Sequence, residues 1–451
     1  MNNSKIRKRP AKIFLIYSLF TFFLYCFGAY NYPRNNQLLL ILFLSICNFA
    51  MYFGFVNGTQ KSWTLDENAP VFPLKKWMTV LFWISLITIV PKFYIFTRIS
   101  VTNISEIIRK ISTFTSSAQD LYTEHHNITR VSGIWQYINY LVVLSSPFTW
   151  IYYVLSMLFW KKLSFWKKIG TIFIWGLTIL QYIVTGTNVG IVEFIGLFAT
   201  CQIISGLSTS RTDKKRKILK FTLNGEPLRF RSKKILFTIG AIIIAILIFS
   251  TVMNSRIGNS YTKSLGFGSF LGTYSESGIN KLLPENIKPI YAYITRYFAG
   301  GYRGLALSFD VPFKCSFGLG YSSFLLNNAG TFSSELWDRT YNMQIFYYTG
   351  YPYDASWHTA FLWIANDVSL FGVPIVLLVL MYFFGKAWGR YLDTGNLGSF
   401  LLFMIYVKMM FFISANNQVF RSFDTLVVFW SMLFFSGRTG RWNWRMEIEK
   451  I

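Results

Sequence analysis

The feature that most constrains this chain is a series of apolar runs, almost free of charge, that are each close to the length of a membrane span. A helix needs about 20 apolar residues to cross the hydrocarbon core, where every backbone amide must find its partner inside the helix. The sequence therefore predicts an all-α polytopic membrane protein with about ten transmembrane helices. They are expected at 13–30, 37–56, 77–96, 134–160, 169–185, 189–207, 235–253, 360–384, 397–413 and 419–436.

The charge of the chain follows the same pattern. Only 14% of residues are charged and 53% are hydrophobic, although the formal net charge is +25. The positive residues lie in short tracts between the apolar runs, which favours topological anchoring over nucleic-acid binding. With a cytoplasmic N-terminus, the inner segments hold 28 Lys and Arg residues and the short outer turns only one. We expect a multi-pass membrane protein with both termini in the cytoplasm and membrane lipids around it. The inner segments are 1–12, 57–76, 161–168, 208–234, 385–396 and 437–451.

One connecting segment, residues 254–356, is too long to be a simple link between spans. Its composition is rich in Tyr, Phe and Trp, so we expect it to fold over the outer surface of the membrane. This divides the chain into three parts. Residues 1–253 are predicted to form a bundle of seven helices, 254–356 a large and partly helical extracytoplasmic loop, and 357–451 a bundle of three helices.

The first candidate site lies in the helical stretch 289–309 of this loop, which Gly300 and Gly301 are expected to interrupt. Arg296 and Arg303 flank the interruption, and guanidinium groups bind phosphate oxygens through paired hydrogen bonds. Tyrosine rings offer flat faces with a polar edge, which suits sugars. The alternative is an interfacial helix with snorkelling arginines and an aromatic belt. The substrate-binding candidates are Arg296, Arg303, Tyr293, Tyr297 and Tyr302.

The second candidate site lies where the loop meets the eighth predicted span. His358 stands at its mouth, and histidine can accept a proton near neutral pH as a general base should. Asp354 lies four residues earlier and either orients His358 or is itself the base. The alternative is an interfacial histidine without a catalytic role.

Ionisable residues inside predicted spans form a third group, since they are costly there and are usually functional or paired. Lys408 and Glu193 are expected to pair across two helices, and Arg421 and Asp424 to pair on one helix. Asp367 interrupts the eighth span. An ion-coupled transporter would also carry such residues, so they do not choose between classes.

No nucleotide-binding or metal-binding motif is present in the sequence. Of the four cysteines, only Cys315 lies in a long loop, so neither a cysteine metal site nor a disulfide framework is predicted. We expect no metal and no cofactor.

Three features together resemble the Wzy-type O-antigen and capsule repeat-unit polymerases of bacteria, which are related to the O-antigen ligases. They are the architecture with a large late outer loop and three closing spans, the segment from His358 through Asp367 to Gly372, and the Arg- and Tyr-rich segment around Arg296 and Arg303. The resemblance covers most of the chain, although its sharp motif is only about fifteen residues long.

The resemblance implies a membrane glycosyltransferase fold and the polymerisation of undecaprenyl-diphosphate-linked oligosaccharides into O-antigen, capsule or exopolysaccharide at the outer face of a bacterial plasma membrane. It implies partners in the same pathway, a flippase and a chain-length regulator, and it places His358 as the base. Many members carry an Arg where this chain has Asn188, so Arg421 or Arg256 is expected to cover the diphosphate instead. The competing interpretations are a ligase with the same donor, a lipid-linked oligosaccharide flippase or other transporter, and a structural protein.

Overall fold

A computed structural model describes most of the chain as helix. The described residues are 3–64, 71–127, 131–207, 240, 272–276, 278–330, 333, 335–353, 358–437 and 445–446. The predicted span at 235–253, apart from residue 240, and the candidate residues Asp354 and Arg256 lie outside them.

Five helices in the described part are long and apolar enough to cross a membrane. Four more, of which three are shorter apolar helices, stand at predicted spans. An all-α membrane protein is thus supported, whereas the number of about ten spans remains a prediction. The five are α1 (Asn3–Phe27), α2 (Gln37–Gly58), α3 (Leu74–Thr97), α5 (Ile134–Leu158) and α15 (Ala360–Thr394), and the four are α6 (Phe165–Val184), α7 (Val189–Leu207), α16 (Leu397–Phe412) and α17 (Phe423–Gly437).

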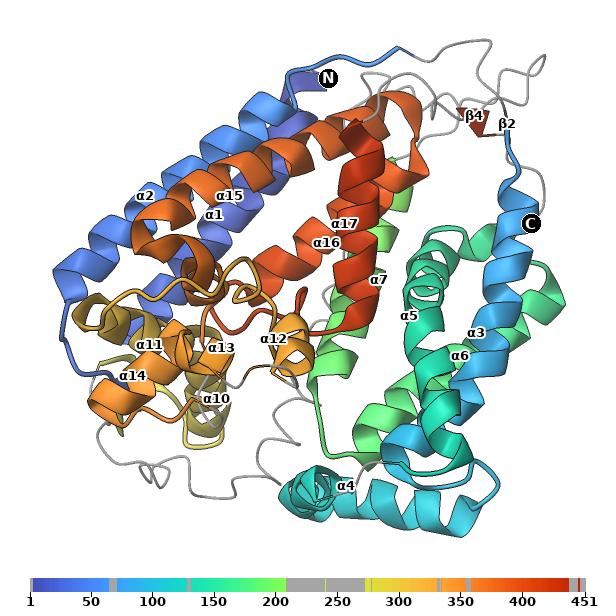
Figure 1. Cartoon of the computed structure of the whole chain (residues 1–451), viewed down its shortest axis with the longest axis horizontal. Helices are drawn as coiled ribbons and strands as arrows, with labels where there is room; N and C mark the ends of the chain where they lie inside the picture. The colour runs from blue at the N-terminus through green and yellow to red at the C-terminus, as the bar shows by residue number, and fades with distance from the viewer. Residues whose placement is uncertain are drawn as a thin grey trace.

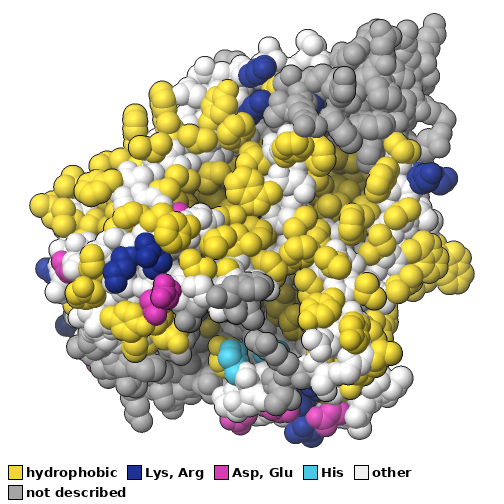
Figure 2. Space-filling model, in the orientation of Figure 1, with side chains coloured by type: hydrophobic (Ala, Val, Ile, Leu, Met, Phe, Trp, Pro, Cys, Tyr) yellow, Lys and Arg dark blue, Asp and Glu magenta, His cyan; other side chains and the backbone are white. Residues whose placement is uncertain are grey.

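The surface of these helices is apolar, as contact with lipid requires. Figure 2 shows hydrophobic side chains over much of the visible face. On α2, large side chains at a helical spacing point outward, among them Leu38, Leu42, Ile46 and Phe49, while Leu40 and Leu44 are buried. A soluble protein rarely exposes a patch of this kind.

The first and last thirds of the chain share one helix interface, because α15 packs along α2 (Figure 1). Glycines make this approach possible. A Cβ atom at Gly54 or Gly58 would collide with the α15 backbone, and one at Gly385 would collide with the α2 backbone. Small residues at a membrane helix interface let the backbones come close, where packing replaces the missing hydrophobic driving force.

The helix at the eighth predicted span has a kink two residues after Asp367. Within α15, Ser369 has φ 61° and ψ 170°, a left-handed φ that is uncommon for a residue with a Cβ. The helix begins at Ala360 as predicted. It ends at Thr394 and not at the predicted Phe384, so its last ten residues lie beyond the apolar run.

The large loop folds as short helices gathered below the C-terminal end of α1 and the N-terminal ends of α2 and α15 (Figure 1). The expected interruption at Gly300 is confirmed, since it separates α10 from α11. Thr273 and Tyr274 (β3) also pair with Tyr30 and Asn31 (β1), which ties the loop to the end of α1. The elements are α9 (Ile279–Leu282), α10 (Lys288–Ala299), α11 (Gly301–Leu307), η4 (Ser308–Asp310), α12 (Ser323–Ala329), α13 (Glu335–Asp338) and α14 (Tyr341–Thr349).

The remaining elements mark the two ends of the bundle. The amphipathic helix α4 (Ile104–His126) lies across the lower end in Figure 1, next to α6. At the upper end, β2 (Val71–Phe72) pairs in parallel with β4 (Arg445–Met446), and the 3-10 turn η1 (Trp160–Lys162) joins α5 to α6. Segments predicted to be cytoplasmic therefore meet at the end opposite the large loop.

Candidate functional site

The candidate site lies where α11 meets the segment before α15. Two glycines allow α11 to pack there without space for a side chain. A Cβ at Gly301 would collide with the Ser414 carbonyl, and a Cβ at Gly304 would lie 2.9 Å from Nδ1 of His358. The structure thus packs Gly304, the residue after Arg303, against His358, although 54 positions separate Gly304 and His358 in the sequence. Tyr351 is a neighbour of both the His358 ring and the Arg303 charge.

Arg303 is buried, with only 4% of its surface exposed. Its Nη1 donates to the Pro33 carbonyl at 3.2 Å, but its Nε is buried without a hydrogen-bond partner. Within the described residues, Arg303 forms no ion pair. Burial lowers the pKa of Arg303, and the nearby Tyr25, Tyr351 and Asp310 act in the opposite direction. A buried guanidinium with an unused donor is costly, and that donor suits an anionic acceptor.

His358 is also buried, and it has no hydrogen bond within the described residues. Its ring meets Tyr351 edge to face at 5.6 Å, and neither ring nitrogen has a partner. Burial lowers the pKa of His358 to about 3 because the imidazolium form would lose its hydration. The ring is therefore neutral at neutral pH, with one nitrogen able to donate and one able to accept.

Arg296 lies one helix earlier and belongs to the same cluster. Its Nη1 is buried without a partner, and its charge acts on Tyr32. Tyr32 stacks on Tyr25 with ring centroids 4.8 Å apart, and Tyr25 in turn faces Arg303. Two tyrosines from the end of α1 therefore connect the two arginines.

Tyr25, Tyr32 and Tyr351 were missed by the reasoning from sequence. The first two belong to the first span and the turn after it, where aromatic residues are expected as an interfacial belt. No local signal separates such a belt from a site. The cluster of two arginines, His358 and these three tyrosines is called the outer cluster below.

The tyrosines that were predicted to bind sugar have other positions. Tyr302 is fully buried and its hydroxyl lies 2.9 Å from Oγ1 of Thr21, which fixes α11 against α1. Tyr293 is fully buried as well, and Tyr297 is half-buried. The rings of Tyr293 and Tyr302 are enclosed in protein, so their positions do not support the predicted role as a sugar-binding surface.

Arg421 is not part of the outer cluster. It is exposed and precedes α17, where it lies near Tyr182 at the C-terminal end of α6. That end leads to Asn188, where the resembled family carries its arginine. Among the described residues, no ion pair joins Arg421 to Asp424, as was predicted. The Asp424 carboxylate instead accepts hydrogen bonds from the Ser422 hydroxyl at 2.5 Å and from the Thr425 amide at 2.7 Å.

Asp367 has a structural role that its place in the motif did not reveal. Its Oδ1 accepts from the Gly318 and Gly320 amides at 2.9 and 3.0 Å, and its Oδ2 accepts from the Tyr321 amide at 2.8 Å. The neighbouring Asn366 side chain accepts from the Tyr341 amide at 2.8 Å. These two residues fasten two parts of the outer loop to the kink in α15.

The expected pair of Lys408 and Glu193 is confirmed. The Nζ and Oε1 atoms lie 2.8 Å apart and join α16 to α7 in a largely buried position. The two charges offset each other inside the bundle, which is the way such residues are tolerated in membrane helices.

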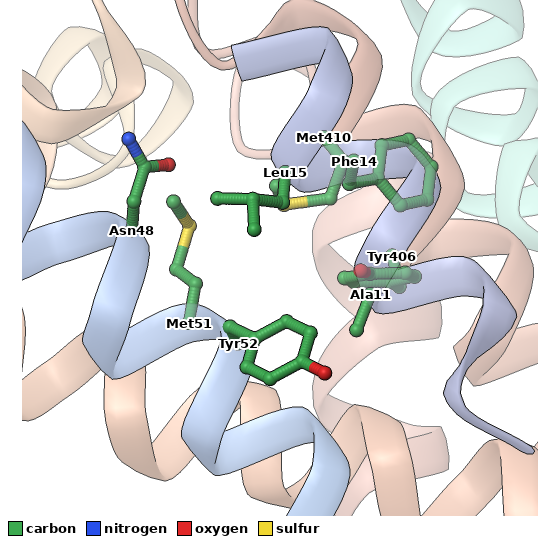
Figure 3. Close-up of a pocket in the computed structure, with 8 residues that line it drawn as sticks. All are labelled: Ala11, Phe14, Leu15, Asn48, Met51, Tyr52, Tyr406 and Met410. Carbon is green, nitrogen blue, oxygen red and sulfur yellow. The ribbon is translucent and has the colours of Figure 1, made fainter. Parts of the chain in front are cut away.

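A separate hollow of about 230 Å³, including the space at its mouth, lies between α1, α2 and α16 (Figure 3). Apolar side chains form most of its wall, and the Asn48 amide oxygen is buried there without a partner. It contains no charged residue, so it is not a candidate active site. Its lining is Ala11, Phe14, Leu15, Asn48, Met51, Tyr52, Tyr406 and Met410.

No protein-family model, curated protein or solved structure matches this chain. The outer cluster must therefore be interpreted from its own chemistry. Within the described residues, no group of His, Cys, Asp and Glu side chains is arranged to hold a metal ion. What the cluster offers is two cationic anchors, a neutral imidazole and three aromatic rings at one end of a membrane bundle.

Proposed function

We propose that this protein is a membrane glycosyltransferase that polymerises undecaprenyl-diphosphate-linked oligosaccharide repeat units at the outer face of the bacterial plasma membrane. The observation that carries the proposal is a buried Arg303 guanidinium with an unused donor and an unpartnered His358 imidazole, both of which have Tyr351 as a neighbour. A phosphate oxygen would accept a hydrogen bond from Nε of Arg303, and a sugar hydroxyl would donate one to a ring nitrogen of His358.

The reaction assigns a task to each kind of residue. The bond between the anomeric carbon and the diphosphate oxygen breaks, and a glycosidic bond to the acceptor hydroxyl forms. The hydroxyl proton passes to a base, and the lipid diphosphate leaves with the electron pair. Arg296 and Arg303 would stabilise the developing negative charge, which is the part of such a reaction that fixed donors accelerate most.

His358 is the proposed base, with Asp354 as the alternative. In the closed site its pKa of about 3 makes it a weak base, although neutral imidazole can already accept a hydrogen bond. A diphosphate bound next to it would favour the imidazolium and raise its pKa. The proposal therefore expects His358 to become a better base when the donor is bound.

Tyr25, Tyr32 and Tyr351 are buried like Tyr293 and Tyr302, so none of these rings offers a free face to a sugar. A ligase with the same donor would use the same groups, and only the acceptor would differ. A transporter gains no support from Lys408 and Glu193, because each charge already has its partner.

The proposal is tested by deleting the gene in its host and complementing it with variants. Gel analysis of surface polysaccharide and of lipid-linked intermediates gives the result. Single repeat units on the outer face without long polymer support the polymerase. Units trapped on the inner face indicate a flippase, polymer that is made but not transferred indicates a ligase, and unchanged polysaccharide refutes all three.

The variant set compares Arg303→Ala and Arg303→Lys with Arg109→Ala, a control at an exposed position on α4 that pairs with Glu106. We expect Arg303→Ala to reduce polymer about a hundredfold, as the loss of one stabilising donor does in other enzymes. Lysine should rescue poorly because one ammonium does not replace a fork of donors. Normal polymer in Arg303→Ala, at equal protein level, would exclude the proposed diphosphate site.

A further inference from the structure

One helix of the large loop carries aromatic rings on its surface. The first part of α14 packs inward, where Tyr341 and Ile345 are buried. The rings that follow are exposed, since Phe346 has 37% of its surface exposed and Tyr347 has 56%. Figure 1 shows α14 at the lower left of the molecule, among the other helices of the loop. Large exposed rings on an otherwise packed loop are typical of a binding surface.

The turn after α14 brings a third ring to this place. Gly350 ends the helix with φ 74°, a left-handed conformation that glycine adopts without strain. The chain then turns back, and the exposed Tyr353 ring meets Phe346 with ring centroids 5.5 Å apart. Phe346 in turn meets Tyr347 at 5.8 Å. These three rings, Tyr353, Phe346 and Tyr347, are called the aromatic row below.

A carboxylate stands at one end of the aromatic row. Asp338 on α13 accepts a hydrogen bond from the Tyr347 hydroxyl at 2.6 Å. This bond is the main reason why the pKa of Tyr347 is raised, and the nearby Tyr353 acts in the same direction. The polar edges of two rings and an acidic group therefore lie together on the surface of the loop.

Exposed tyrosines near a membrane also form interfacial belts, and the charge beside the row distinguishes the two roles. Rings of a belt lie among phospholipid headgroups, whose phosphates are negative and are repelled by a carboxylate such as Asp338. Arg339, the next residue, donates to the Cys315 carbonyl at 2.6 Å and lies over the Phe317 ring. Ring faces beside a hydrogen-bond acceptor suit sugars better than phosphate groups.

The aromatic row is continuous with the outer cluster. Tyr351 lies between Gly350 and Tyr353 in the chain, and its buried ring meets His358 at 5.6 Å. The same turn that returns Tyr353 to the row therefore places Tyr351 in the outer cluster. A ligand on the row lies next to the proposed reaction site.

We propose that the aromatic row binds the sugar chain of the substrate and holds it beside the outer cluster, an inference that rests on the function proposed above. Sugar rings pack against the ring faces of the row, and their hydroxyls donate hydrogen bonds to Asp338. Three rings in a row contact more than one sugar, so the ligand is an oligosaccharide. The row supplies the free ring faces that the buried tyrosines of the outer cluster lack.

The first part of the test measures binding without polymerisation. The full chain, purified in a neutral detergent, is titrated with oligosaccharides released from the surface polysaccharide of its host, and saturation-transfer NMR follows binding. Tyr347→Ala combined with Tyr353→Ala should bind these oligosaccharides at least roughly tenfold more weakly, because two ring contacts are lost. Tyr347→Phe combined with Tyr353→Phe keeps the ring faces and should lose much less affinity.

The second part measures polymer length in the host after deletion and complementation. The double alanine variant should make shorter polymer, because a chain that is held less tightly leaves the enzyme earlier. The control is Tyr137→Ala combined with Tyr140→Ala, which removes two exposed tyrosines at the start of α5 and should leave the length unchanged. An equal effect of both pairs would identify an interfacial belt and overturn the proposal.

The outcomes separate this inference from the proposed function. If the wild type restores polymer but does not bind the oligosaccharides, the aromatic row is not a sugar site although the polymerase function stands. The same holds if the double alanine variant binds them and extends polymer like the wild type. Surface polysaccharide that is unchanged by the deletion refutes the polymerase and, with it, this inference.

Discussion

Replacing Asp367 by asparagine tests whether this residue of the motif fastens the outer loop. The carboxylate accepts three backbone amides, from Gly318, Gly320 and Tyr321, at 2.8 to 3.0 Å. Asparagine keeps one oxygen, and its NH₂ group cannot accept. If the oxygen keeps the two glycine amides, the Tyr321 amide loses its acceptor, and the two remaining bonds lose the assistance of the negative charge.

The expected magnitude follows from these bonds. A hydrogen bond to a charged group contributes about 1.5–3 kcal/mol, and a buried donor left without a partner costs about 1–3 kcal/mol. We therefore expect Asp367→Asn to lower the free energy of unfolding by about 2–4 kcal/mol. Asp338→Asn is the matched control, because its carboxylate accepts only the exposed Tyr347 hydroxyl at 2.6 Å and should cost less than about 1 kcal/mol.

The assay is unfolding of the purified protein in detergent, followed by the protection of residues 315–322 from protease. Asp367→Asn should expose this segment before the membrane helices unfold, since the lost bonds hold the loop and not the bundle. If the two variants were equally stable and equally protected, the bonds to Asp367 would not hold the loop and the reasoning would be refuted. Lower activity with unchanged stability would instead indicate a direct role in the reaction.

Three further predictions concern buried groups. Gly304→Ala should cost about 1–3 kcal/mol and displace His358, whereas Gly196→Ala, with open space at its Cβ, should be neutral or stabilising in thermal unfolding. Lys408→Ala should lower the free energy of unfolding by about 3–5 kcal/mol, because it leaves Glu193 unpaired. The double variant Lys408→Ala with Glu193→Ala should lose less stability than Lys408→Ala alone, and a larger loss would contradict this reasoning. Because the folded pKa of His358 is depressed, the folded state binds fewer protons, so stability is retained above the unfolded pKa of about 6.5 and falls as the pH drops below it. Between pH 7 and pH 5 we expect a loss of about 1–2 kcal/mol that is absent in His358→Gln, and equal pH profiles would exclude the effect.

The membrane helices are the part of the fold that the sequence predicts best. Their starts at Gln37, Ile134, Val189, Ala360 and Leu397 agree with the prediction to the residue. The physical reason is that the free energy of transferring a side chain into hydrocarbon depends on that side chain and its immediate neighbours. The end of α15 was placed ten residues too early for the same reason, since buried contacts with α2 continue beyond the apolar run.

The candidate site was predicted only in part. The type of residue was sufficient to select Arg296, Arg303 and His358, because few side chains suit phosphate or proton transfer. Their meeting was not predictable, since it depends on Gly304 leaving space for the imidazole. The tyrosines from the end of α1 and the exclusion of Arg421 likewise follow from contacts between distant segments.

By itself, the sequence determined that this is an all-α membrane protein with one folded loop, because hydropathy and positive charge act locally along the chain. Only the tertiary structure decided which polar groups share a place. It packed Gly304 against His358 at one end and placed Trp63 among cationic side chains at the other. A buried polar group needs a hydrogen-bond partner, and which residue supplies it depends on how distant segments pack and not on their spacing in the sequence.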